Sequence, residues 1–285
     1  MHTPADQTAN DRMIPRVRAG HVELAVIDRG AGPPLVLVHG FPLDHSMWQP
    51  QIDFFSTRRR VVAPDLRGFG ASQIVSGTAS MEAMADDLDV LLDALGITEP
   101  VVVCGLSMGG YVALQFWRKY ARRLRALVLC DTRAVADTPE AARLRSQQVD
   151  LVLREGMAPL AEAMLPKLFA AATFASQPGV VAGQRSTILA ARAEGVAAAL
   201  LGMAARPDAT DYLPRIALPT LVVVGQHDAI STVDEMRGMA RAIPEAELVV
   251  IPDAGHMSPL ENPAAFNAAL EQFLARVERG APLAD

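Results

Sequence analysis

The sequence VVVCGLSMGG occupies residues 101–110. Its first four residues have the apolar, β-branched character of a buried strand, and the run 111–120 that follows is compatible with a helix. A strand that turns at once into a helix leaves no space for side chains beside the turn, and glycine stands at both Gly105 and Gly109. The stretch therefore predicts a strand–turn–helix with Ser107 exposed at its tip in a strained backbone conformation. A glycine-rich turn used only for packing is the alternative interpretation.

Short apolar runs like the one before this turn recur along the chain and alternate with segments of helical period. Continuous apolar runs of this length are typical of parallel strands that are covered on both faces. The pattern predicts an α/β fold with a mostly parallel central sheet and helices on both of its faces. The other predicted strands are Leu35–Val38, Val61–Ala63, Leu127–Cys130, Leu221–Val224 and Leu248–Ile251.

Two of the intervening helices carry recognisable end signals. Ser80 has the character of an N-cap and Gly96 that of a helix stop, with apolar residues on one face between them. Near the C-terminus, Asn262 is expected to cap a helix whose first turn contains Pro263.

The region between the predicted strands 127–130 and 221–224 is different, because it contains many Ala, Leu and Met residues at helical spacing but no convincing strand. We interpret residues 133–206 as a helical cap above one edge of the sheet. The core is then predicted to comprise residues 21–132 and 207–280, and residues 1–20 are expected to be a loosely held N-terminal segment.

A serine hydroxyl is a poor nucleophile until a base removes its proton, and that base must itself be held in one tautomer. Asp228 follows one predicted strand and His256 follows the next, in the order Ser, acid, His along the chain. Because the carboxyl ends of parallel strands meet at one edge of a sheet, all three residues are expected there. The sequence predicts Ser107 as nucleophile, His256 as base and Asp228 as the residue that orients the base.

Other residues could fill these roles. His227 is an alternative base, although it lies beside Asp228 in the same loop, and Asp131 is an alternative acid after its own predicted strand. Asp253 is given no role.

The negatively charged oxygen formed during acyl transfer needs two backbone donors. We predict them to be the N–H of Met108, directly after the nucleophile, and the N–H of Phe41 in the loop 39–42. Gly40 would allow that loop to bend towards the substrate, and His39 is expected to brace it. No metal-binding spacing of Cys and His is present, so no catalytic metal ion is expected. Acyl transfer through a serine needs no cofactor, so none is expected either.

The composition fits a globular protein, since 51% of the 285 residues are hydrophobic and 20% are charged. The formal net charge is −6 and no dense basic stripe exists, so no nucleic-acid partner is expected. Cys104 and Cys130 lie in or at the end of apolar runs and are expected to be buried free thiols. No leader-like segment and no run of about 18 apolar residues is present, so we expect no membrane span and a cytoplasmic location.

Together these motifs resemble the α/β-hydrolase superfamily from about Val22 to Leu274. The segment from Asp65 to Ser72 and the combination of His256 with residues 261–263 are similar to that family as well. The resemblance implies an α/β-hydrolase fold with the helical cap inserted after the sixth strand. Segments near residues 138–140, 154–157 and 194–198 are similar to the carboxylesterase and 3-oxoadipate enol-lactonase branch. Relatives that use aspartate as nucleophile are excluded by Ser107.

The resemblance and the motifs imply a serine esterase that acts through an acyl-enzyme on a small-molecule ester. A lactonase is the first alternative, and acyl transfer, peracid formation or carbon–carbon bond hydrolysis could use the same residues. A ligand receptor with slow turnover is the alternative of another class. Whether the chain forms a homodimer is left open.

The cap is expected to supply the substrate pocket. An enol-lactonase would need cations near the substrate, for which Arg133, Arg185 and Arg192 are candidates. Apolar residues of the cap that could line an acyl pocket, although ordinary packing is the more frequent reason for such residues, are Met157, Met164, Leu165, Phe169 and Met203.

Overall fold

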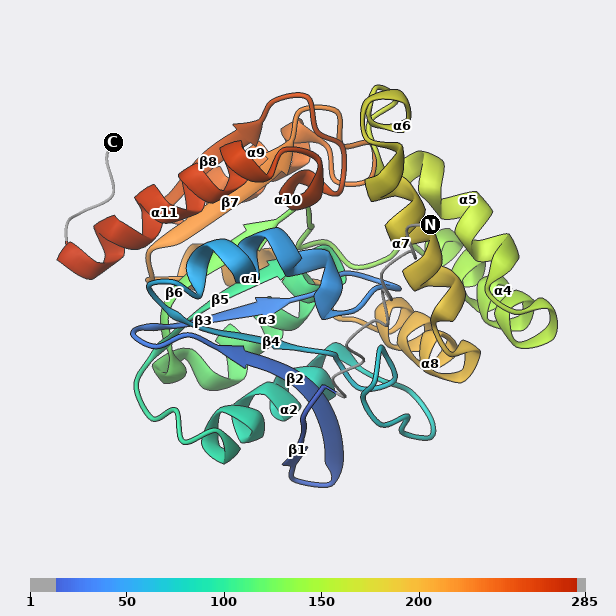
Figure 1. Cartoon of the computed structure of the whole chain (residues 1–285), viewed down its shortest axis with the longest axis horizontal. Helices are drawn as coiled ribbons and strands as arrows, with labels where there is room; N and C mark the ends of the chain where they lie inside the picture. The colour runs from blue at the N-terminus through green and yellow to red at the C-terminus, as the bar shows by residue number, and fades with distance from the viewer. Residues whose placement is uncertain (1–13, 281–285) are drawn as a thin grey trace, which may run out of the picture.

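The structure, a computed structural model, describes residues 14–280. One eight-stranded sheet forms the centre of the molecule (Figure 1). The strand order is β1-β2-β4-β3-β5-β6-β7-β8, and every neighbouring pair from β4 to β8 is parallel. All six predicted strands are present and the predicted α/β-hydrolase fold is confirmed. The strands are β1 (Arg16–Ala19), β2 (Val22–Arg29), β3 (Pro34–Val38), β4 (Arg60–Pro64), β5 (Val101–Leu106), β6 (Leu124–Cys130), β7 (Thr220–Gly225) and β8 (Ala246–Ile251).

β1 and β2 were not predicted from the sequence, because charged residues interrupt their apolar pattern. β2 pairs antiparallel with β4, and β1 pairs antiparallel with β2 at the edge of the sheet. The N-terminal segment that was expected to be loosely held thus includes a strand at residues 16–19, while residues 1–13 lie outside the described part of the chain.

β8 differs from its predicted environment. Its apolar run predicted a strand covered on both faces, but β8 lies at the other edge of the sheet and is only half-buried. Val250, for example, is 37% exposed. An apolar run therefore identified the strand correctly but not its place in the sheet.

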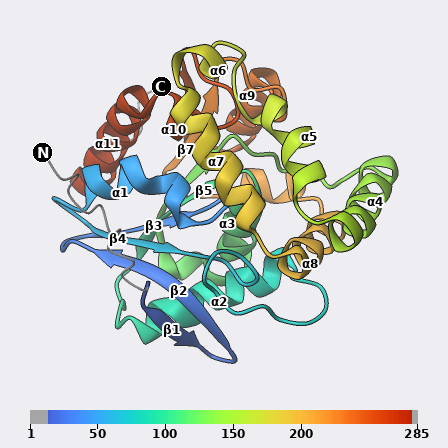
Figure 2. The same cartoon turned by 45° about the vertical axis from the view of Figure 1, so that its right-hand side comes forward.

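Helices cover both faces of the sheet (Figures 1 and 2). α1 and α11 pack together on one face, and α2 and α3 pack together on the other. The predicted caps are confirmed, since Ser80 Oγ accepts from the Ala83 N–H at 3.1 Å and Asn262 Oδ1 accepts from the Ala265 N–H at 3.1 Å. The helices of the core are α1 (Gln49–Phe55), α2 (Met81–Ala94), α3 (Met108–Tyr120), α9 (Val233–Ala242), α10 (Ser258–Glu261) and α11 (Pro263–Arg279).

Five α-helices follow β6 and precede β7, all within the region expected to be a cap. Figure 1 shows them grouped at the end of the sheet towards which the parallel strands point. No single helix within residues 14–280 has the length and hydropathy of a membrane span, and α7 and α8 satisfy both only as a pair bent by 96°. The five helices are α4 (Pro139–Glu155), α5 (Ala158–Leu168), α6 (Thr173–Ser176), α7 (Pro178–Ala190) and α8 (Ala193–Ala204).

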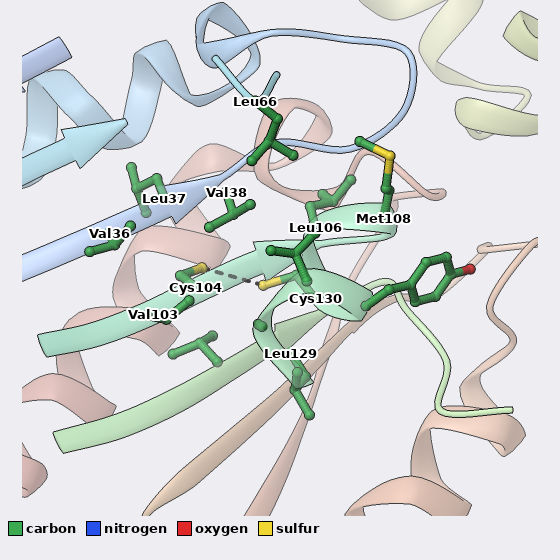
Figure 3. Close-up of a cluster of buried hydrophobic side chains, with 14 of the residues drawn as sticks. Val36, Leu37, Val38, Leu66, Val103, Cys104, Leu106, Met108, Leu129 and Cys130 are labelled. Atoms are coloured by element: carbon green, nitrogen blue, oxygen red, sulfur yellow. Dashed lines mark hydrogen bonds between the residues drawn. The ribbon is translucent and has the colours of Figure 1, made fainter. Parts of the chain in front are cut away.

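A dense apolar cluster lies beneath the turn between β5 and α3 (Figure 3). Cys104 and Cys130 meet within it, with their sulfur atoms 3.6 Å apart. Both cysteines are buried and free, which confirms the prediction, and burial raises the pKa of the Cys130 thiol well above its usual value. The strand ends that carry Ser107 and Asp131 are therefore fixed by close apolar packing.

The region expected to be a cap is in direct backbone contact with the core at α8. A Cβ atom on Gly202 would lie 1.9 Å from the Ala79 carbonyl oxygen, and a Cβ atom on Gly195 would lie 2.0 Å from the Gly68 carbonyl oxygen. These glycines allow helix and loop backbones to touch directly.

We expect Gly202→Ala to lower the free energy of unfolding by about 1–3 kcal/mol, because the added methyl group forces α8 away from the core. Gly183→Ala in α7 is the matched control, since nothing lies within 4 Å of its Cβ position. That control should gain up to about 1 kcal/mol from helix propensity. Urea denaturation of both variants measures the difference, and unchanged stability of Gly202→Ala would show that this contact is not tight.

Candidate active site

Ser107 lies between β5 and α3 in a strained conformation, with φ +54° and ψ −113°. The turn is possible because the glycines around it lack side chains. A Cβ atom on Gly105 would lie 2.2 Å from the Gly109 carbonyl oxygen, and one on Gly109 would lie 2.2 Å from the Val38 carbonyl oxygen. This geometry is the strand–turn–helix that the sequence predicted.

His256 and Asp228 come together on neighbouring loops after β8 and β7. His256 Nδ1 lies 2.8 Å from Asp228 Oδ2, and both side chains are buried. The other oxygen of Asp228 accepts from the N–H groups of Ile230 and Ser231, at 2.7 and 3.0 Å. The carboxylate is thus held by its own loop while it fixes the orientation of the imidazole.

Within residues 14–280, none of the alternative residues is hydrogen-bonded to the His256 ring. Asp131 Oδ1 accepts from the Gly225 N–H at 2.8 Å, and its other oxygen accepts from the Ser258 hydroxyl, so it links three loops rather than contacting His256. Burial and the charge of Asp228 raise the pKa of the Asp131 carboxyl well above its usual range. His227 and Asp253 are both exposed.

The two predicted oxyanion donors are available. Within residues 14–280, neither the Phe41 N–H nor the Met108 N–H donates a hydrogen bond to another protein group. Met108 is the first residue of α3, where backbone N–H groups have no acceptor within the helix. Phe41 also lines the cavity described below.

His39 braces the loop that carries Phe41, as the sequence predicted. Its Nε2 accepts from the Leu66 N–H at 2.9 Å, and its Nδ1–H donates to the Gly40 carbonyl oxygen at 2.9 Å. Burial lowers the pKa of His39, which favours the neutral ring that this pair of hydrogen bonds requires. The loop after β3 is thereby tied to the segment after β4.

A second histidine strengthens the same connection. His45 Nδ1 lies 2.6 Å from Asp65 Oδ1, and Asp65 Oδ2 accepts from the Ala71 N–H at 2.8 Å. Together with Asp44, these two residues place three potential metal-ligand atoms within 4.8 Å of one another. However, the Asp44 carboxylate already accepts hydrogen bonds from Ser46. Hydrogen bonds therefore account for this cluster, and nothing else in it indicates a metal ion.

A cavity of about 250 Å³ lies between the core and the cap. Ser107 and His256 both line it, with Phe41, and the cap contributes residues from α4, α5 and α8. Of the apolar cap residues named from the sequence, Met164 and Met203 line the cavity. Its other lining residues, which sequence reasoning missed, are Tyr111, Arg145, Gln148, Lys167, Leu168 and Ile230.

The cations of the cavity are not those named from the sequence. Arg133 and Arg185 pair with Glu235 and Glu162, and Arg192 donates to backbone carbonyls, so all three lie away from the cavity lining. Arg145 and Lys167 line it instead. The charge of a residue does not show which face of a cap helix meets the core. Tyr111 lies one helical turn after Ser107, so helix periodicity could have identified it as a cavity-lining residue.

The pair of His45 and Asp65 predicts a pH dependence of stability. Burial alone would lower the pKa of His45, but the hydrogen bond and charge of Asp65 outweigh it and raise that pKa above 6.5. A raised folded-state pKa contributes stability that is complete below about 6.5 and is lost as the pH rises through the higher folded value. The stability advantage of wild type over His45→Gln should therefore shrink across this range.

Urea denaturation at a series of pH values measures this advantage. His21→Gln is the control, because His21 is exposed and makes no ion pair within the described chain. An advantage that stays constant or grows with pH would contradict the assignment.

Comparisons with known proteins agree with this geometry. A family model described as the alpha/beta hydrolase fold matches residues 33–263. The 3-oxoadipate enol-lactonase 2 of Acinetobacter baylyi is 30% identical over 244 residues, which cover 86% of this chain and 89% of that protein.

Solved structures give the same result. A thermophilic esterase from Thermogutta terrifontis, solved with malate bound, is 52% identical with a TM-score of 0.90, over 92% of this chain and 98% of that one. The enol-lactonase from Burkholderia xenovorans LB400 is 33% identical with a TM-score of 0.86, over 92% of this chain and 100% of that one. This chain therefore belongs to the α/β-hydrolase family, on the branch that includes these esterases and enol-lactonases.

Proposed function

We propose that this protein is a serine hydrolase that cleaves carboxylic esters of small molecules through an acyl-enzyme. One observation carries the proposal: Ser107 and His256 line the same cavity, and His256 is held by Asp228 at 2.8 Å. A nucleophile, a base and an orienting carboxylate in this arrangement are the requirements of acyl transfer. The 52% identity to a protein named as an esterase supports the same reaction.

In the first half-reaction, Ser107 Oγ attacks the ester carbonyl carbon while its proton passes to His256 Nε2. Asp228 accepts the Nδ1–H hydrogen bond and stabilises the imidazolium that forms. The carbonyl oxygen becomes an oxyanion, which the N–H groups of Phe41 and Met108 stabilise. The tetrahedral intermediate then collapses, and His256 gives its proton to the leaving alkoxide, so that an alcohol departs and an acyl-Ser107 ester remains.

In the second half-reaction, His256 removes a proton from water as the water oxygen attacks the acyl carbon. The same two backbone donors stabilise the second oxyanion. When that intermediate collapses, His256 returns the proton to Ser107 Oγ and the carboxylic acid is released.

A lactone is the second candidate substrate, and the lining of the cavity favours one that carries a carboxylate. Arg145 and Lys167 place two cations at the wall that the cap contributes. Arg145 also pairs with Asp137, whereas Lys167 forms no ion pair within residues 14–280. A carboxylate on the substrate would give Lys167 a partner. Two proteins similar to this one are named enol-lactonases, which supports this candidate too.

We expect Ser107→Ala to lose about 10³-fold or more in kcat/KM on p-nitrophenyl esters from acetate to decanoate, because no other group can form the acyl-enzyme. Ser186→Ala, a change of an exposed serine in α7, is the control and should match wild type. Equal rates for wild type and Ser107→Ala would contradict the proposed nucleophile. A single burst of product without turnover would favour the receptor alternative instead.

We expect Lys167→Gln to raise KM roughly 2- to 5-fold for an ester or lactone that carries a carboxylate, since an exposed ion pair contributes little more than this. KM for the matching neutral ester should stay unchanged. Arg185→Gln removes the same charge from the cap outside the cavity and should alter neither value. Steady-state kinetics with both substrates test the assignment, and equal effects of the two variants would contradict it.

A further inference from the structure

Glu261, at the end of α10, is a buried carboxylate that the reaction described above does not use. Glu261 is only 4% exposed, and its carboxylate forms no ion pair with Lys or Arg within the described part of the chain. A buried carboxylate without a cation must be stabilised by hydrogen-bond donors. Glu261 has four of them, and they come from two separate parts of the molecule.

One carboxylate oxygen binds the residues on either side of His256. Glu261 Oε1 accepts from the Gly255 N–H at 2.8 Å and from the Met257 N–H at 3.2 Å. These two bonds fix the backbone immediately before and immediately after the proposed base. The position of the imidazole therefore depends on the position of this oxygen.

The other oxygen binds the cap. Glu261 Oε2 accepts from the Ala170 N–H at 2.8 Å and from the Thr173 hydroxyl at 2.5 Å. The Glu261 backbone carbonyl also accepts from the Gln177 side chain at 2.8 Å. Residues 170–177 lie directly after α5 and include α6, so one side chain connects the cap to the loop of His256.

Backbone contacts reinforce this connection. The Met257 N–H also donates to the Leu168 carbonyl oxygen at 3.1 Å, and Leu168 lines the cavity. A Cβ atom on Gly255 would lie 2.6 Å from the Ala170 nitrogen, so the two backbones are in direct contact. A substrate that contacts Leu168 thus contacts a segment bonded to the backbone beside His256.

Four donors on one side chain require a carboxylate. Both of its oxygens accept hydrogen bonds, whereas a glutamine amide has one oxygen and an NH₂ group that only donates. In Glu261→Gln, one pair of donors would face another donor, and leaving buried donors unpaired is costly. No rotation of the amide can satisfy both sides.

We propose that Glu261 is a positioning residue that joins the cap segment 168–177 to the loop of His256. The base is then correctly placed only when this segment is packed against Glu261. This inference rests on the proposed function, because it assigns His256 the role of base. The cap then sets the rate of the reaction as well as the shape of the pocket.

The test compares Thr173→Val, Thr173→Ser and Glu261→Gln with wild type. Thr173→Val removes only the hydroxyl donor on the cap side and leaves Gly255 and Met257 bound to Glu261. Thr173→Ser keeps that donor and is the conservative rescue. Glu271→Gln, a change of an exposed carboxylate on α11, is the matched control for loss of charge.

We expect Thr173→Val to lower kcat while KM stays within about 2-fold, since misplacement by about 1 Å can cost up to roughly 10²-fold in rate. Thr173→Ser should restore most of the rate, and Glu261→Gln should lose about 10- to 100-fold. Glu271→Gln should match wild type. Hydrogen exchange should rise in Thr173→Val at residues 253–260 as well as at residues 168–177.

Two results would overturn the inference. One is wild-type kcat in folded Thr173→Val and Glu261→Gln. The other is a loss of thermal stability in Thr173→Val without any change in kcat or in exchange at residues 253–260, which would make the contact purely structural. If Glu261→Gln does not fold, Thr173→Val and Thr173→Ser decide the question.

Failure of the proposed function would look different. In that case the wild-type protein would not hydrolyse p-nitrophenyl acetate. A fluorophosphonate, which labels activated serines, would also fail to label Ser107. Exchange at residues 253–260 would still report whether Thr173 and the loop of His256 are coupled, because that measurement needs no turnover.

Discussion

The close approach of backbones at the turn between β5 and α3 is the constraint on which the rest of the structure depends. Gly105 and Gly109 lie within contact distance of neighbouring backbone carbonyls, so any side chain at these positions would push the strand, the helix and the first loop apart. Ser107 is held at φ +54° by this packing, and the apolar cluster beneath it fixes the strands on either side. Strain of this kind persists only where the surroundings define the backbone completely.

Buried carboxyl side chains hold the loops in place through hydrogen bonds, as glycine packing holds the turn. Asp65 accepts from the backbone of His45 and of Ala71, Asp131 connects the ends of β6 and β7 to Ser258, and Glu261 connects the loop of His256 to the cap. A carboxylate is suited to this purpose because its two oxygens can accept several N–H or O–H donors from different segments. The loops after β3 and β4 are in this way held to each other, and so are the loops after β6, β7 and β8, without a covalent bond.

We expect the cap to give the proposed site its selectivity. The catalytic residues proposed here all come from the core, whereas Met164, Lys167, Leu168 and Met203 approach them from above and narrow the cavity to about 250 Å³. The polar side chains of Arg145, Gln148 and Lys167 lie on the cap side. Polar groups placed on one wall of a cavity fix the orientation of a substrate and provide specificity. Esters and lactones that share a reactive carbonyl would then be separated by what surrounds that carbonyl.

The sequence by itself determined the fold class, six of the strands, the caps at Ser80 and Asn262, and the order of Ser107, Asp228 and His256. These features follow from local periodicity and turn chemistry, which neighbouring residues carry among themselves. It did not determine that β8 lies at an edge, that Arg145 and Lys167 rather than Arg133, Arg185 and Arg192 line the cavity, or that Glu261 joins the cap to the base. Those features depend on which helix face or strand edge meets a distant segment, and only the tertiary packing decides that, because contacts between segments far apart in the chain leave no local pattern in the sequence.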